Sequence, residues 1–306
     1  MHWYTAAPRL VDTTTARAAW LALRGDLETF GPPESPESEL VAPVAAPFDS
    51  VDAAVEGLAD LETRLRTRGD RRAVFLTIYE RMTRAVRDGI EGGRFVDAAW
   101  MREYTTTFAN YYRRAFLAFE RGRLGAVPDP WRVAFGTARR ADRLVVQDAF
   151  LGVNAHINYD LALALRDVGL DPGRERKYAD HRAIDDILSG LVDAQQTALA
   201  ELYAPEVDDI DRALGRLDET LTLRSMTEGR EQAWRIAVVL TDAPWSPLRA
   251  LARQVLRTTA TGAAFLVRGP DLDPALVGRL RAAERDGLDL ETVLERVKTT
   301  LDDTAV

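Results

Sequence analysis

Cysteine is absent from the 306 residues, and lysine occurs only at Lys177 and Lys298. The lack of cysteine excludes disulfides, thiolate zinc sites, iron–sulfur clusters and cysteine nucleophiles. No apolar run reaches the roughly 18 to 20 residues that a membrane span needs. The start, Met1-His2-Trp3-Tyr4, lacks the basic and then apolar stretch of a secretory signal. We therefore expect a cytoplasmic protein without a membrane span.

Basic residues are also fewer than acidic ones. The formal net charge is -8, with 40 basic and 48 acidic residues. Nucleic-acid binding needs clustered cations that neutralise phosphates. The composition thus argues against a nucleic-acid partner, and a small-molecule ligand or substrate of unknown kind is the remaining expectation.

Alternating strand patterns are missing throughout, whereas apolar residues recur at helical spacing in many segments. The sequence predicts an all-α fold, a multi-helix bundle around a buried central helix at about 144–165. Residues 1–49 are expected to form an N-terminal helix, at about 12–30, and a Pro-rich strap over the surface. Residues 50–268 are the helical body with the candidate site, and residues 269–306 are an acidic C-terminal helical appendage.

The central segment carries the strongest chemical signal. It is apolar on all sides, yet Asn154, His156, Asn158 and Asp160 lie in its middle. Burying a polar group without a partner costs roughly 1 to 3 kcal/mol. At helical spacing, His156 and Asp160 share one face and Asn154 and Asn158 another. We expect the two asparagines to be structural, clamping neighbouring backbone groups inside the core.

The next helix, expected at about 180–203, repeats the spacing with His181 and Asp185. If the two helices pack antiparallel, His156, Asp160, His181 and Asp185 would converge on one divalent metal, either zinc, iron or manganese. Asp160 and Asp185 are then the candidate catalytic carboxylates. Two alternatives remain open: hydrogen-bonded His–Asp pairs with a purely structural role, and a metal-free acid–base site.

Other motifs have simpler interpretations. The run Asp208-Asp209-Ile-Asp211 resembles an aspartate-rich terpene-cyclase motif, but Glu206-Val207 and a helix start there favour capping and complementation of the helix dipole instead. Ser225 and Glu228 have the spacing of a capping box. The aromatic residues spaced along 104–119 are expected to be core, with tyrosine hydroxyls able to reach a polar pocket.

Four segments resemble an uncharacterised helical family, domain of unknown function 5995, over roughly residues 50–265. They are Phe108-Ala-Asn-Tyr111-Tyr112, Val127-Pro128-x-x-Trp131 with Phe135, the block Leu151-Gly-Val-Asn-Ala-His-Ile-Asn-x-Asp160-Leu161, and Asp180-His181-x-x-Ile184. This chain has Asp185-Asp186 where the family is asparagine-like. The resemblance implies a shared helical site and no particular reaction.

Three functions follow from these patterns. The first is a metal-dependent all-α enzyme, possibly a hydrolase acting on a small or an ester or phosphoester substrate, in which the metal activates water. The second is a non-catalytic helical module that binds a ligand or partner, with a structural His/Asp/Asn cluster. The third is a terpene-cyclase-like or other lyase.

Overall fold

A computed structural model describes residues 13–32, 38–203, 226–269, 274–286 and 290–304. The described residues form helices and connecting turns without any β-strand, so the all-α prediction is confirmed. The terpene-cyclase-like run at 208–211 and the cap residue Ser225 lie outside the described residues. Among the described helices, none is both long and apolar enough to cross a membrane.

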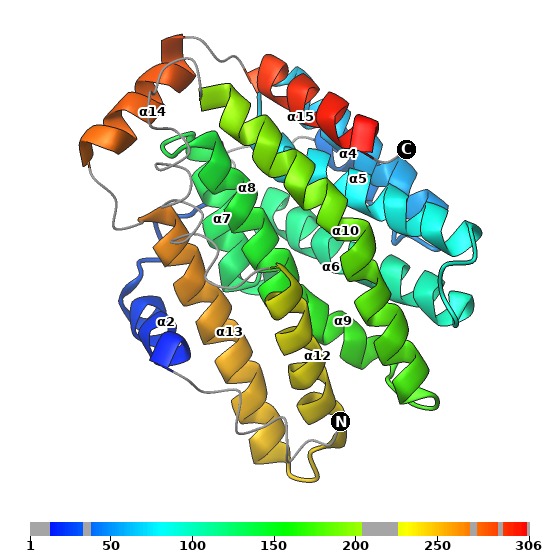
Figure 1. The fold of residues 1–306 in the computed structure, drawn as a ribbon. Helices are drawn as coiled ribbons and strands as arrows, with labels where there is room; N and C mark the ends of the chain where they lie inside the picture. Colours follow the sequence, from blue (N-terminus) through cyan, green and yellow to red (C-terminus); the bar gives the residue numbers. More distant parts are fainter. Residues whose placement is uncertain (1–12, 33–37, 204–225, 270–273, 287–289, 305–306) are drawn as a thin grey trace.

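Figure 1 shows the described helices, coloured in chain order. Their bounds are α2 Thr13–Arg24, α3 Ser38–Val41, η2 Ala42–Val44, α4 Val51–Thr67, α5 Arg72–Glu91, α6 Ala98–Glu120, η3 Leu124–Ala126, α7 Asp129–Arg140, α8 Val145–Ala155, η4 His156–Asp160, α9 Leu161–Val168, α10 Arg174–Tyr203, α12 Met226–Asp242, α13 Ser246–Arg268, α14 Pro274–Asp286 and α15 Leu290–Thr304.

The central element is the continuous rod α8–η4–α9, which matches the predicted buried helix. Its first part packs against α5, α7 and α13, and its last part against α6 and α12. Leu151, Ala155, Leu161 and Leu165 on this rod are fully buried. Helices therefore surround the rod, as its apolar circumference predicts.

Two boundaries differ from the sequence expectation. The helix that carries His181 begins at Arg174, about six residues before the predicted start, directly after the turn at Gly173. The Pro-rich segment is more than a surface strap, because its described part contains α3 and η2. Leu40 and Val44 of these short helices are buried in the core.

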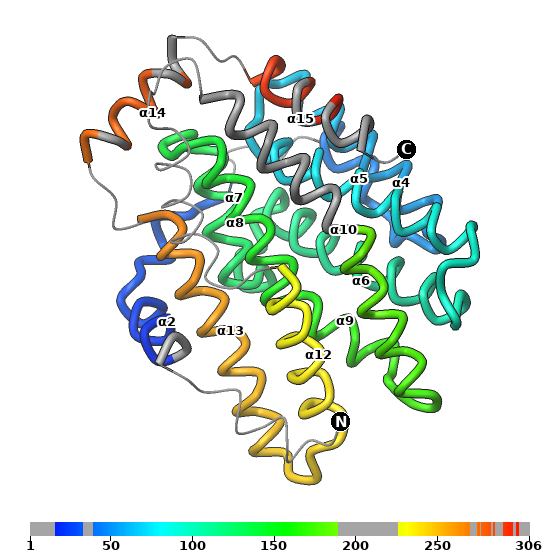
Figure 2. Tube along the Cα trace, viewed as in Figure 1, coloured from blue at the N-terminus to red at the C-terminus, as the bar shows by residue number. Residues whose placement is uncertain are grey.

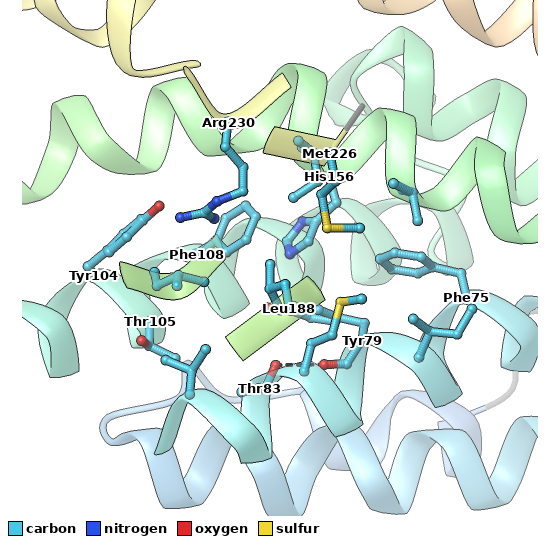
Figure 3. Close-up of a pocket in the computed structure, with 16 residues that line it drawn as sticks. Phe75, Tyr79, Thr83, Tyr104, Thr105, Phe108, His156, Leu188, Met226 and Arg230 are labelled. Carbon is cyan, nitrogen blue, oxygen red and sulfur yellow. Dashed lines mark hydrogen bonds between the residues drawn. The ribbon is translucent and has the colours of Figure 1, made fainter. Parts of the chain in front are cut away.

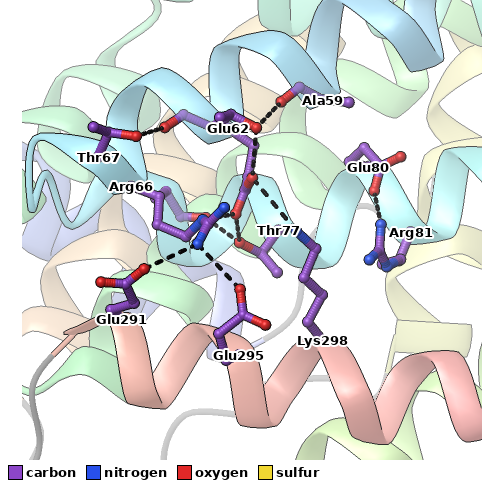
Figure 4. A network of polar contacts seen from close by, with 12 residues as sticks. Ala59, Glu62, Arg66, Thr67, Thr77, Glu80, Arg81, Glu291, Glu295 and Lys298 are labelled. Atoms are coloured by element: carbon purple, nitrogen blue, oxygen red, sulfur yellow. Dashed lines mark hydrogen bonds and ion pairs between the residues drawn. The ribbon is translucent and has the colours of Figure 1, made fainter.

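The C-terminal helix α15 packs on α5 and α10, and its course beside α5 can be followed in Figure 2. The contact with α4 is polar: Arg66 reaches Glu291 and Glu295 at 3.3 and 3.1 Å (Figure 4). The buried carboxylate of Glu62 accepts a hydrogen bond from Thr77 at 2.9 Å and lies 4.0 Å from Lys298. Ion pairs across the contact thus position α15 against the body.

The N-terminal helix α2 packs closely on α13, where a glycine makes the approach possible. A Cβ atom at Gly262 would lie 1.8 Å from the main-chain oxygen of Ala18. Since that neighbour is backbone, it cannot rotate away. Gly262 therefore sets the distance between α2 and α13.

Replacing Gly262 with alanine is expected to displace α2 from α13 and lower the melting temperature. Hydrogen exchange should show faster exchange of the α2 amides, with α8 unaffected. Gly278→Ala in α14 is the matched control, because nothing lies within 4 Å of its new methyl group. That variant should gain up to about 1 kcal/mol from helix propensity. Unchanged α2 protection in Gly262→Ala would contradict the prediction.

Candidate functional site

The candidate site lies where the central rod departs from α-helical geometry. Residues His156–Asp160 form a π-helical turn, in which the Leu161 amide donates to the His156 carbonyl five residues earlier. Such wide turns are rare inside helices and occur often at functional sites. The turn places both members of the first predicted His–Asp pair at the centre of the molecule.

The carboxyl group of Asp160 holds this pair together. Its Oδ2 lies 3.2 Å from His156 Nδ1 and accepts a hydrogen bond from Trp131 Nε1 at 2.8 Å. All three side chains are buried, and Asp160 is 0% exposed. Its Oδ1 atom makes no hydrogen bond to any residue that the structure describes. Asp160 Oδ2 is therefore the one carboxyl oxygen that bonds to both His156 and Trp131 within the described residues.

Aromatic rings enclose the imidazole of His156. The Phe108 ring is parallel to it with a centroid distance of 3.6 Å, and Tyr79 meets it edge-on at 4.2 Å. Phe75 adds a third ring at 5.8 Å, and it packs so closely over Gly152 that a Cβ atom there would lie 2.3 Å from it. The absence of a side chain at Gly152 thus leaves room for the Phe75 ring beside His156.

Burial shifts the pKa of both members of the pair toward the neutral form. Desolvation raises the pKa of the Asp160 carboxyl well above its ordinary value, against a smaller lowering by the Trp131 hydrogen bond. Desolvation also lowers the pKa of His156 well below its ordinary value. Both directions follow from the cost of charge in an apolar environment.

These directions favour one hydrogen-bonding arrangement of the imidazole. A protonated Asp160 donates from Oδ2 to His156 Nδ1 while the same oxygen accepts from Trp131. The remaining ring proton of a neutral imidazole is then on Nε2. This atom is buried and makes no hydrogen bond within the described chain. We infer that Nε2 is a donor without an acceptor.

The second predicted pair has different partners. His181 Nε2 faces the Arg230 carbonyl at 3.2 Å, and its Nδ1 faces the Tyr104 hydroxyl at 3.0 Å. Asp185 accepts a hydrogen bond from Arg230 Nε at 2.6 Å. Burial, together with the Arg230 charge, lowers the pKa of His181 well below its ordinary value. Both nitrogens of the His181 ring are thus engaged by protein groups.

The four predicted metal ligands therefore divide into two groups. Asp160 is hydrogen-bonded to both His156 and Trp131. His181 and Asp185 are instead each hydrogen-bonded to Arg230. Within the described ranges, no three His, Asp or Glu side chains lie together so that they could hold a metal ion. The described hydrogen bonds thus give the two pairs separate partners, and a common four-ligand centre stays a prediction.

The asparagines on the other face have main-chain and side-chain partners. Asn154 donates to the Ala260 carbonyl of α13 at 2.9 Å, and Asn158 donates to the Asn154 side chain at 3.0 Å. This chain of two hydrogen bonds connects the central rod to α13. It has the geometry that a structural clamp requires, and the energetic role stays a prediction.

A small cavity of about 60 Å³ lies beside His156 (Figure 3). Of the four predicted ligands, His156 lines it. Its wall is mostly apolar, and the polar side chains that reach it include Tyr104, Thr105 and Arg230. His156 and Arg230 lie on either side of the Phe108 ring in Figure 3. The structure thus replaces the expected polar metal pocket with an apolar one.

Sequence reasoning missed two partners in this region. The sequence motif that contains Trp131 does not pair it with Asp160. A buried indole N–H needs an acceptor, and the Asp160 carboxyl supplies one. Arg230 was not singled out, although it is four residues from both Met226 and Trp234 and thus shares their helix face. An arginine on an otherwise apolar stripe is a signal that a buried anion or ligand is near.

Asn158→Ala is expected to lower the free energy of unfolding by about 1 kcal/mol, the net value of one hydrogen bond. Asn154→Ala should cost more, up to about 3 kcal/mol, because it removes both bonds of the clamp. Urea denaturation followed by circular dichroism measures both changes. Gln254→Ala, at an exposed position of α13, is the control and should stay within about 0.5 kcal/mol. If neither asparagine variant changes the free energy of unfolding, the clamp is excluded.

The raised pKa of Asp160 predicts the direction in which stability changes with pH. Below about pH 4 both folded and unfolded states hold the proton, and above it only the folded state does. Wild-type stability should therefore fall relative to Asp160→Asn as pH rises from 5 to 8, by up to about 1.4 kcal/mol per pH unit. Urea unfolding of both proteins across this range tests the sign. A gap that stays constant across this range would identify an Asp160 that is ionised in the folded protein.

Comparison with known proteins places the chain in a family without an assigned activity. Neither a search of curated proteins nor a search of solved structures finds a match. The sequence profile of one family matches residues 51–270, which include the central rod, both histidine pairs and Arg230. The chain belongs to the family of unknown function DUF5995.

Proposed function

We propose that the helical body binds a small, mostly apolar molecule in the cavity beside His156, and that this molecule accepts a hydrogen bond from Nε2. The observation that carries the proposal is the buried Nε2 atom without a partner. An unsatisfied buried donor costs about 1 to 3 kcal/mol, which a ligand acceptor recovers. An apolar cavity with few polar groups is the usual form of a small-molecule site.

The cavity limits the size of the bound molecule. Its volume of about 60 Å³ is well below the roughly 150 Å³ of a dry cavity that accepts benzene. Two methionines, Met82 and Met226, belong to its wall. Methionine side chains change rotamer readily and adapt to different contents. The site therefore accepts a few non-hydrogen atoms directly and a larger body when these methionines move.

Metal-dependent hydrolysis, on a small or an ester or phosphoester substrate, receives less support from the geometry. His156 and Asp160 offer two ligands, and within the described ranges no third His, Asp or Glu joins them. His181 has both ring nitrogens engaged by Tyr104 and Arg230. A single divalent zinc, iron or manganese ion would need ligands other than the four expected ones.

Proton transfer to the bound molecule is the second candidate. It is favoured because the pair can pass one proton to a bound carbonyl oxygen: Nε2–H gives its proton to the ligand while the Asp160 carboxyl gives its proton to His156 Nδ1, which leaves a neutral imidazole and an Asp160 carboxylate. A ketone probe separates binding from this chemistry. Nuclear magnetic resonance in D₂O would show the methyl protons of acetophenone exchanging faster with the wild type than with His156→Leu if the pair performs acid–base catalysis.

Binding itself is tested with two neutral probes of similar size. Acetophenone has a carbonyl acceptor, and ethylbenzene has none. Acetophenone should bind several-fold more tightly and shift the ¹⁵N resonance of His156 Nε2, because only it can accept the hydrogen bond. His156→Leu should remove this preference and bind both probes equally. Calorimetry measures the affinities.

Thr105→Val is the matched control, because Thr105 lines the same cavity but its hydroxyl is already bonded to the Met101 carbonyl. Its preference for acetophenone should equal that of the wild type. If neither probe binds the wild type and the His156 resonances stay fixed, the cavity is not a ligand site.

A further inference from the structure

We propose that α2 and the N-terminal half of α13 form a docking surface for an anionic lipid bilayer. This α2–α13 surface is defined by six exposed side chains: Arg17, Trp20, Leu23, Trp245, Leu251 and Arg253. The inference concerns the outside of the molecule and does not depend on the ligand site beside His156. It assigns binding at the bilayer surface and no membrane span.

Large apolar side chains are exposed mainly on these two helices. Five such side chains are exposed in the described part of the chain, and Val96 is the one that lies elsewhere. The others are Trp20, Leu23, Trp245 and Leu251, with exposed fractions of 53%, 82%, 65% and 55%. Single exposed apolar residues are normal on a protein surface, whereas a group of them on two helices in contact marks an interaction site.

The charge of the two helices is entirely positive. Every charged residue of α2 and α13 is an arginine, although the whole chain has a net charge of -8. Arg257 and Arg268 pair with Asp129 and Asp142. None of the four others is in an ion pair with a described residue: Arg17, Arg24, Arg249 and Arg253. Positive charge without a compensating carboxylate attracts an anionic partner.

The neighbouring acidic residues lie at the borders of this surface. Asp26 follows α2 and accepts a hydrogen bond from the Thr29 hydroxyl at 2.8 Å. Asp242 ends α12, before Trp245, and is paired with Arg174 at 2.5 Å. The Asp242 carboxylate therefore already has a cationic partner, and the arginines of the α2–α13 surface remain available to an external anion.

Both helices direct these side chains away from the body of the molecule. Ala18 of α2 lies directly against Gly262 of α13. Leu251 precedes Gly262 by about three helical turns and is thus on the same side of α13. Trp20 is two positions after Ala18, about 200° around α2, and points away from α13. The outer side of α2 and the uncovered part of α13 therefore face the same way.

An anionic bilayer offers both of the partners that the α2–α13 surface requires. Tryptophan rings are favoured at the boundary between headgroups and acyl chains, and leucines enter the same layer. Arginines bind the phosphates and anionic headgroups outside that layer. In α2 the two functions adjoin, because the Arg24 guanidinium lies 4.3 Å from the centre of the Trp20 ring. An acidic protein would pair with the arginines and offer less to the four apolar side chains.

Vesicle sedimentation tests the proposal with the full chain. The protein should sediment with vesicles of equal parts phosphatidylglycerol and phosphatidylcholine, and several-fold less with phosphatidylcholine alone. Raising the salt concentration from about 0.05 to about 0.5 M should lower the bound fraction several-fold, because the arginine charges are then screened. Brominated acyl chains should quench the fluorescence of the bound protein, since Trp20 and Trp245 would enter the boundary layer.

Two double variants separate the apolar contribution from the charge. Trp20→Ser/Trp245→Ser should lower the partition coefficient on anionic vesicles at least about tenfold and remove most of the quenching. Arg17→Gln/Arg253→Gln should lower it about tenfold or more and reduce its dependence on salt. Circular dichroism checks that each variant folds.

The matched control changes the same kinds of residue outside this surface. Arg94 and Val96 are exposed in the turn between α5 and α6, and Val96 is 69% exposed. Arg94→Gln/Val96→Ser should therefore bind anionic vesicles as the wild type does.

Each result decides the proposal. If the wild type does not sediment with anionic vesicles, or binds phosphatidylcholine equally well, the proposal is wrong. If both double variants bind as tightly as the wild type, the bilayer contacts another surface and the assignment is also wrong. If the wild type forms a dimer that either variant disrupts and binds no vesicles, a second copy is the occupant instead. Should the variants not fold, the absence of quenching in the wild type still overturns the inference.

Discussion

A carboxyl group without access to water is the constraint on which the centre of this molecule depends. Asp160 is fully buried, and the partners that the structure gives it are an indole N–H and an imidazole nitrogen. Neither partner carries a full positive charge in an apolar environment, so the neutral form of each group is favoured. The aromatic residues around His156 maintain that environment, and this in turn leaves the outer ring nitrogen without a partner.

The fold class and the position of the central helix could be predicted because both depend on apolar periodicity alone. A rod that is apolar on every side must be surrounded, and α8–η4–α9 is surrounded by other helices. The π-helical turn could not be predicted in the same way. Face assignments assumed a constant rotation per residue, whereas the wide turn at His156–Asp160 changes that rotation within the motif itself.

The His–Asp spacing identified the chemically unusual residues but not their partners. Helical spacing states which residues share a face, and it says nothing of which distant helix meets that face. Arg230 is 49 residues after His181 in the chain, yet it donates hydrogen bonds to both Asp185 and the His181 carbonyl. Residue types that suit a metal also suit buried hydrogen bonds, so the pairing had to come from three-dimensional structure.

The π-helical turn also lets the central rod carry one extra residue without changing the packing on either side of it. A π-helical turn holds one residue more than the α-helical turn it replaces. Deleting a single residue between His156 and Asp160 would therefore leave a regular α-helical turn, with α9 close to its present rotation relative to α8. Leu161 and Leu165 would then stay buried against α6 and α12. The side chains of the turn itself would change direction, so such a deletion would alter the His156–Asp160 pair far more than the packing of α9.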